Sequence, residues 1–124
     1  MDKTLEDLKA VILAYFDALN RSDAELLGSV FHDKALYAST TGGDIRFWSM
    51  EHYLPIVAAR PAPASRGEVN NGRIVSITIA GPDAATAIVQ MTLLGRDYTD
   101  ILSFVRQDGR WRIAAKVFDS TPKP

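Results

Sequence analysis

The sequence predicts an α+β fold in which helices from the first part of the chain pack on one face of a mainly antiparallel sheet. Apolar residues recur at helical spacing near the start of the chain, and they alternate with polar residues from about residue 69 onward. Two-residue turn signals separate the later strands. A chain of 124 residues is long enough for one compact core. We therefore expect one domain over residues 1–124.

Three helices are expected, over residues 4–20, 22–32 and 49–60. The first has one apolar face, with residues spaced three and four apart. Ser22 and Glu25 form a capping box that begins the second helix, and Ser49 caps the third. Pro55 lies inside the third helix, where it removes a hydrogen bond. A kink or an early end is therefore expected there.

Six strands are expected, over residues 35–41, 44–48, 69–80, 84–94, 97–106 and 110–118. Gly42-Gly43 indicates a hairpin, and Gly95-Arg96 and Asp108-Gly109 indicate two-residue hairpin turns. Residues 61–67 are rich in proline and are expected to form a loop. Whether this loop acts as a lid stays open.

These turns set a strand register that places eleven residues on one face of the sheet: Val89, Met91, Leu93, Tyr98, Asp100, Leu102, Phe104, Trp111, Ile113, Ala115 and Val117. We expect this face to meet the helices. Asp100 is its one charged residue, predicted opposite Met91 and Val117. A buried carboxylate must be hydrogen-bonded, paired, protonated or facing a polar cavity. Asp100 is therefore either a structural acceptor or a pocket group that orients a ligand or acts as an acid or base.

His32 is predicted at the end of the second helix. It either bonds the helix carbonyls or works with Asp100 as a proton carrier. The remaining candidates for a ligand site are mostly aromatic residues with a polar tip, which suit a flat polar ligand and also an ordinary core. They are Tyr15, Trp48, Tyr53, Tyr98 and Met91.

Composition excludes several classes of function. The net charge is -1 with both signs scattered, which argues against nucleic-acid binding. Cysteine is absent, the two histidines lack metal-ligand spacing, and the glycines form no phosphate-binding motif. We therefore expect neither a metal nor a cofactor. Because no apolar run is long enough for a membrane span or a signal core, a cytoplasmic location is expected.

Four segments, 15–20, 22–27, 31–35 and 108–118, resemble the nuclear transport factor 2-like (NTF2-like) superfamily with its cystatin-like fold. Within it the chain is most similar to the group named "putative lumazine-binding" and to SnoaL-like proteins. The resemblance spans nearly all of the chain. It implies a cone, in which a strongly curved sheet holds three helices on its concave side around a pocket. It also implies a homodimer formed through the outer sheet face.

Three functions remain open, and whether the protein is an enzyme is undecided. The first is binding of a small molecule in a pocket of the lumazine-binding kind. The second is a cofactor-free lyase, cyclase or isomerase for an aromatic or polyketide-like substrate, with Asp100 and His32 as acid and base. The third is a dimeric association module. The ketosteroid isomerases of the superfamily carry a general-base carboxylate on the first strand after the second helix, where this sequence has none in residues 37–40.

Overall fold

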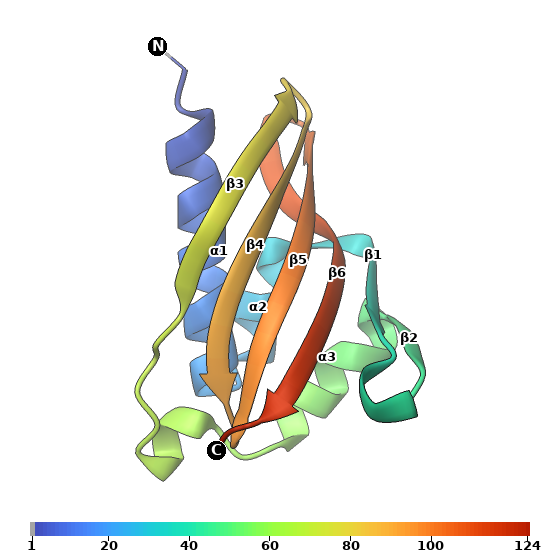
Figure 1. Ribbon diagram of the computed structural model, residues 1–124. Coiled ribbons are helices and arrows are strands. Elements are labelled where there is room, and N and C mark those ends of the chain that lie inside the picture. Colours follow the sequence, from blue (N-terminus) through green and yellow to red (C-terminus); the bar gives the residue numbers. More distant parts are fainter. Residues whose placement is uncertain (1) are drawn as a thin grey trace.

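The computed structural model describes residues 2–124 and confirms the α+β class. Within that range three α-helices cover one face of a six-stranded sheet (Figure 1). The helices are α1 (Thr4–Arg21), α2 (Ala24–Val30) and α3 (Met50–Ala59), with short 3-10 turns η1 (Thr41–Gly43) and η2 (Pro63–Arg66). The strands are β1 (Phe31–Ser39), β2 (Arg46–Ser49), β3 (Arg73–Gly81), β4 (Ala84–Leu93), β5 (Arg96–Gln107) and β6 (Arg110–Pro122).

The sheet is curved, open and mixed, with strand order β2-β1-β6-β5-β4-β3. β1 pairs with β6 in parallel, and the other neighbours pair antiparallel. All three helices lie behind the sheet in the view of Figure 1, and α1 runs beside β3 and β4. The hollow of the curved sheet is thus the place where helices and strands enclose the core.

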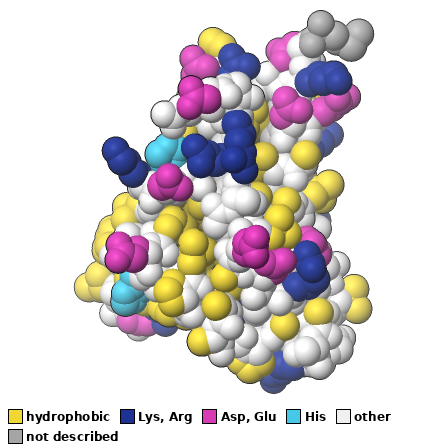
Figure 2. Space-filling model, turned by 180° about the vertical axis from the view of Figure 1, so that it is seen from behind, with side chains coloured by type: hydrophobic (Ala, Val, Ile, Leu, Met, Phe, Trp, Pro, Cys, Tyr) yellow, Lys and Arg dark blue, Asp and Glu magenta, His cyan; other side chains and the backbone are white. Residues whose placement is uncertain are grey.

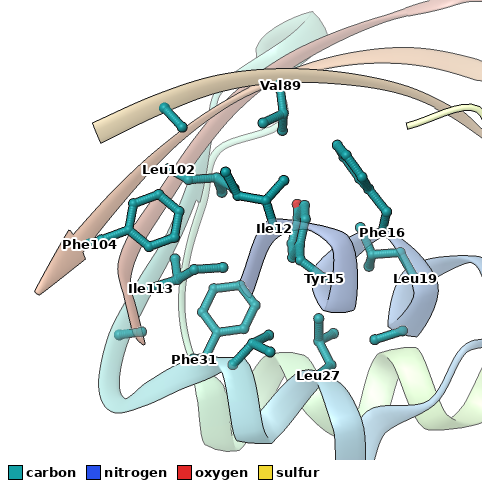
Figure 3. Packing of buried hydrophobic residues seen from close by; sticks show 14 of the residues in the cluster. Ile12, Tyr15, Phe16, Leu19, Leu27, Phe31, Val89, Leu102, Phe104 and Ile113 are labelled. Carbon is teal, nitrogen blue, oxygen red and sulfur yellow. The ribbon is translucent and has the colours of Figure 1, made fainter. Parts of the chain in front are cut away.

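Helix α1 forms because its apolar residues repeat along one stripe that the sheet can cover. Leu8, Ile12, Tyr15, Phe16 and Leu19 are all buried. Figure 3 shows this stripe facing residues of β4, β5 and β6, with the Tyr15 hydroxyl directed toward the sheet. The stripe itself is therefore apolar except for the polar tip of Tyr15.

The second helix is shorter than predicted, which changes the position of His32. Asp23 caps α2 by accepting a hydrogen bond from the Leu26 backbone N–H at 3.0 Å. The helix ends at Val30 because Phe31 adopts extended backbone angles and pairs with Ile113 of β6. His32 consequently lies on β1, and its predicted place in a last helical turn is wrong.

Three other predicted boundaries are also corrected. Helix α3 continues for four residues beyond Pro55, so the early end expected there does not occur. β3 begins at Arg73 instead of residue 69, because Asn70 forms a local turn in which its side chain accepts the Gly72 N–H at 3.0 Å. At the other end of the chain, β6 extends past residue 118 to Pro122.

The turn between β4 and β5 lies one residue earlier than predicted. Leu94 and Gly95 occupy it with φ values of 50° and 80°, the left-handed pair that a type I′ hairpin turn requires. The register therefore shifts by two residues and places Asp100 opposite Val89 instead of Met91. Since the shift is even, the inward face of β5 remains the predicted one.

An irregularity between β5 and β6 changes the inward face of β6. Phe104 pairs with Ile113, but Ser103 pairs with Ala115, so β6 carries one extra residue at this point. Beyond it Lys116 points inward and is 4% exposed, whereas Val117 points outward and is 47% exposed. The predicted inward positions of Ala115 and Val117 are therefore wrong.

Gly72 allows β3 to approach α1 closely. A Cβ atom built on Gly72 would lie 2.3 Å from the Phe16 ring, far inside van der Waals contact. We expect Gly72→Ala to lower the free energy of unfolding by about 1–3 kcal/mol through overpacking. Gly81→Ala is the control, since nothing lies within 4 Å of its added Cβ. Urea unfolding curves test the pair, and equal midpoints for the two variants would contradict this packing.

Candidate functional site

Asp100 lies inside the protein on the inward face of β5, where it is 2% exposed. Tyr15 of α1 donates a hydrogen bond from its hydroxyl to Asp100 Oδ2 at 2.5 Å. The second carboxylate oxygen, Oδ1, is buried and has no hydrogen-bond partner among residues 2–124. Asp100 is therefore an interior carboxylate with one oxygen satisfied by the protein and one free to accept a bond.

Lys116 of β6 is a site residue that sequence reasoning missed. Its Nζ lies 3.9 Å from Asp100 Oδ2, and its side chain is as buried as that of Asp100. Aromatic rings surround the ammonium, with centroids between 5.1 and 5.5 Å from Nζ; they belong to Tyr15, Tyr37, Tyr53 and Phe118. Each ring face attracts a cation at such distances. The interior thus holds a lysine stabilised by one carboxylate and four rings.

Arg60 supplies a second cation to the same region. It follows the last turn of α3, where its backbone N–H donates to the Ile56 carbonyl at 3.2 Å. Its side-chain Nε and Nη2 are buried without a hydrogen-bond partner among the described residues. Buried donors of this kind are rare in folded proteins and call for an explanation. The prediction placed Arg60 at the helix end and assigned it no role.

These groups line a small interior cavity of about 20 Å³, which is room for about one water molecule. Its wall combines aliphatic, aromatic and charged residues: Leu19, Tyr37, Tyr53, Arg60, Met91, Leu93, Tyr98, Asp100 and Lys116. Three different elements, α1, α3 and the sheet, contribute to it. The interior between helices and sheet is therefore nearly filled by side chains.

Burial changes the pKa values of several titratable groups at this site. Burial raises the pKa of Tyr15 well above its usual value, and the negative charge of Asp100 raises it further. Burial also raises the pKa of Tyr37, against the opposing charge of Lys116. For Lys116, burial lowers the pKa, but the oxygens of Tyr53, Asp100 and Tyr37 outweigh it and the net direction is upward. At neutral pH the site thus holds neutral phenols beside a lysine cation.

Most of the predicted ligand-site residues lie near Asp100. Tyr53, Tyr98 and Met91 line the cavity, and Tyr15 is bonded to Asp100 directly. Trp48 lies one layer further out, stacked on Tyr37 with ring centroids 4.9 Å apart and an interplanar angle of 11°. It supports the cavity wall without being part of it.

His32 is not brought to Asp100. Its Nε2 lies 2.8 Å from Gln107 Oε1, and its Nδ1 accepts the Lys34 backbone N–H. Gln107 and Asp100 are seven residues apart on β5, about 23 Å along an extended strand. Figure 2 shows two separate histidine side chains reaching the surface on the helix side. Among residues 2–124 no group of three or more potential ligands is placed to hold a metal ion.

The burial of Tyr15 beside Asp100 predicts how stability depends on pH. The folded state keeps the Tyr15 proton at pH values where the unfolded chain, with a pKa of about 10, has lost it. The stabilisation that comes from keeping this proton is therefore complete below about pH 10, and it is lost as pH rises through the pKa of Tyr15 in the folded state. We expect the free energy of unfolding to fall above about pH 10, and to fall less steeply in Tyr15→Phe. Urea unfolding across this range tests it; identical slopes for both proteins would contradict it.

Comparison with known proteins found a matching family and several solved structures with a similar fold. A family described as "Putative lumazine-binding" matches residues 3–119. An NTF2-like protein of unknown function from Silicibacter pomeroyi has 24% identity and a TM-score of 0.84, covering 98% of this chain and 100% of that one. A ketosteroid isomerase-like protein from Erwinia carotovora atroseptica has 14% identity and a TM-score of 0.74, covering 98% and 100%. At these identities the solved structures show the fold alone.

A cystatin-like fold protein from Burkholderia xenovorans has 14% identity and a TM-score of 0.71, covering 100% of this chain and 96% of that one. No curated protein matches the chain. Within residues 2–124 no helix is both long enough and apolar enough to cross a membrane. The solved structures show that the fold is NTF2-like and cystatin-like, and the family match over most of the sequence shows that the chain belongs to the "Putative lumazine-binding" family.

Proposed function

We propose that the protein binds a flat small molecule between its helices and its curved sheet, with Asp100 and Lys116 at the base of the site. The observation that carries this proposal is the set of buried polar atoms without partners around one cavity. Asp100 Oδ1 and two nitrogens of Arg60 are unsatisfied there. A core with a purely structural role normally satisfies such atoms, because each unmade bond costs about 1–3 kcal/mol. A ligand would supply the missing partners.

The present cavity is too small for a ring system, so binding requires side chains to move. Tyr98 is only partly buried, and Met91 has a flexible, unbranched side chain. Arg60 leads directly into segment 61–67, the proline-rich stretch that contains η2. Outward movement of these groups would join the cavity to the surface. The family description suggests lumazine-like heterocycles as the first ligands to test.

Catalysis is the alternative, as a cofactor-free lyase, cyclase or isomerase acting on an aromatic or polyketide-like substrate. Such a reaction needs an acid and a base that both reach the substrate. Tyr15 and Lys116 adjoin Asp100, whereas His32 of β1 contacts Gln107, at the end of β5 far from Asp100. Since the pKa values of Tyr15 and Lys116 both lie above their usual ranges, neither is tuned for proton transfer near neutral pH. The separation of His32 from Asp100 removes the predicted acid–base pair and therefore favours binding.

We also propose a homodimer through the outer sheet face. Strand register places an apolar row across five strands, formed by Phe47, Ala38, Val117, Ile101 and Ile88. Phe47, Val117 and Ile101 are 64%, 47% and 45% exposed. Such a row can pack against its own copy about a two-fold axis. Light scattering is expected to give twice the 13.6 kDa chain mass, falling to one chain mass in Val117→Lys. A wild-type particle of 13.6 kDa would contradict this proposal.

A thermal-shift screen tests the binding function. Lumazine and other flat heterocycles, steroids and aromatic polyketides are added to the wild type, to Asp100→Asn, and to the control Asp33→Asn, whose side chain is exposed. A compound that binds only the folded protein raises its melting temperature. We expect a shift in the wild type and in Asp33→Asn that is lost in Asp100→Asn. Equal shifts in all three proteins would place binding elsewhere and contradict the proposal.

A further inference from the structure

The cavity carries an excess of positive charge. Lys116 and Arg60 contribute two cations to its wall, and Asp100 contributes one carboxylate. Burial raises the pKa of Tyr37, which also lines the cavity, so this phenol adds no negative charge at neutral pH. This local balance is opposite in sign to the net charge of the whole chain, which is -1. The interior therefore holds one cation more than its carboxylate can neutralise.

The Lys116–Asp100 ion pair does not remove this excess of positive charge. Its N–O distance of 3.9 Å is longer than a hydrogen bond, so the pair is attractive but not in direct contact. Arg60 opposes it, since the charge of the guanidinium disfavours the charged form of Lys116. Two cations that repel each other beside one distant carboxylate favour an additional negative charge between them.

Arg60 has the geometry to bind such a charge. Its Nε and Nη2 atoms, both buried and without partners, belong to the planar fork that matches the two oxygens of a carboxylate. No Asp or Glu side chain makes an ion pair with Arg60 among the described residues. The site thus has two buried donors without partners on a residue that lines the cavity.

We propose that the ligand is a planar aromatic anion whose carboxylate or similar acidic group lies between Arg60 and Lys116. This inference rests on the proposed binding function and specifies the class of ligand. The aromatic body would pack against the rings of Tyr37, Tyr53 and Tyr98. Asp100 Oδ1, which lacks a partner, would accept an N–H or O–H of the ligand. A neutral ligand would leave a desolvated cation without compensation.

Matched acid and amide pairs test the charge of the ligand. The probes are quinoline-2-carboxylate, naphthalene-2-carboxylate and lumazine-6-carboxylate, each with its primary amide, titrated by calorimetry. The proteins are the wild type, Arg60→Met and Arg66→Met, in which Arg66 is an exposed arginine of η2. We expect at least one acid to bind the wild type and Arg66→Met about tenfold more tightly than its amide. In Arg60→Met this preference is expected to disappear.

The outcomes separate the two proposals. An acid and its amide that bind equally well, with binding lost in Asp100→Asn, would overturn the anion inference and leave the binding function intact. Binding of neither acids nor amides, in a protein that also shows no shift in the wider screen, would overturn both.

A second readout needs no ligand. Because two Arg60 nitrogens already lack partners, Arg60→Met is expected to melt no lower than the wild type. A melting temperature several degrees lower would show that protein groups already satisfy Arg60. That result would overturn the inference.

Discussion

Replacing Lys116 with methionine is expected to lower the free energy of unfolding by about 3–5 kcal/mol, because it leaves Asp100 as a buried charge without its cation. Methionine keeps much of the side-chain volume, so the loss reports charge more than packing. Urea unfolding at neutral pH measures it. Lys34→Met is the matched control, since Lys34 lies exposed on β1, and it should change stability by no more than about 0.5 kcal/mol.

A double-mutant cycle shows whether the two charges act on each other. The double variant Asp100→Asn/Lys116→Met removes both charges. Its loss in free energy of unfolding should be smaller than the sum of the losses in the two single variants by about 0.5–3 kcal/mol. Strict additivity, or a Lys116→Met protein as stable as the wild type, would show that the two side chains are not paired in the interior.

Replacing Phe31 with alanine is expected to lower the free energy of unfolding by a similar amount, about 3–5 kcal/mol. Phe31 is 1% exposed and packs edge-on against Tyr15 and Tyr53, at centroid distances of 6.1 and 6.2 Å. Its removal leaves a cavity next to the two tyrosines that adjoin the site. Loss of the ring also weakens the start of β1, where Phe31 pairs with Ile113.

Leu13→Ala is the control for this change, because Leu13 is 60% exposed on α1. Its effect on the unfolding midpoint should stay near the measurement error. Comparable losses for Phe31→Ala and Leu13→Ala would contradict the position of Phe31 at the centre of the core.

The parts of the fold that follow from regular patterns could be predicted. The stripe of α1 repeats over many residues, and its burial by the sheet follows from the spacing alone. The inward position of Asp100 also survives an error in the turn, because a two-residue shift preserves the face of a strand. The alternation of inward and outward side chains along the strand was therefore enough to identify Asp100 as the candidate carboxylate.

The lysine beside it could not be found in the same way. The irregularity in β6 lies at Ala114 and Ala115, whose small side chains fit either face and carry no pattern. One signal was present, since Phe118 is out of phase with Ile113 and an interior Asp100 needs a cation. Together these observations favour an inward Lys116 over an inward Val117.

Arg60 and His32 show a different limit of sequence reasoning. Arg60 follows a helix and precedes a proline, and nothing in that local pattern indicates a guanidinium directed into the core. The position of His32 depended on whether α2 or β1 includes Phe31, and that choice is made by pairing with distant Ile113. A contact between residues far apart in the sequence decided the position of His32.

The four tyrosines of the chain provide the most direct test of the central claim, that the ligand binds at the Asp100–Lys116 site. Tyr37, Tyr53 and Tyr98 line the cavity and Tyr15 bonds Asp100, so ring-labelled tyrosine NMR signals all report on this region. The protein is titrated with the compound that stabilises it most, and the Phe47 ring serves as an outer reference. We predict that tyrosine signals shift and saturate while the Phe47 signal stays fixed. Saturable binding that moves Phe47 and leaves all four tyrosines unchanged would contradict the account.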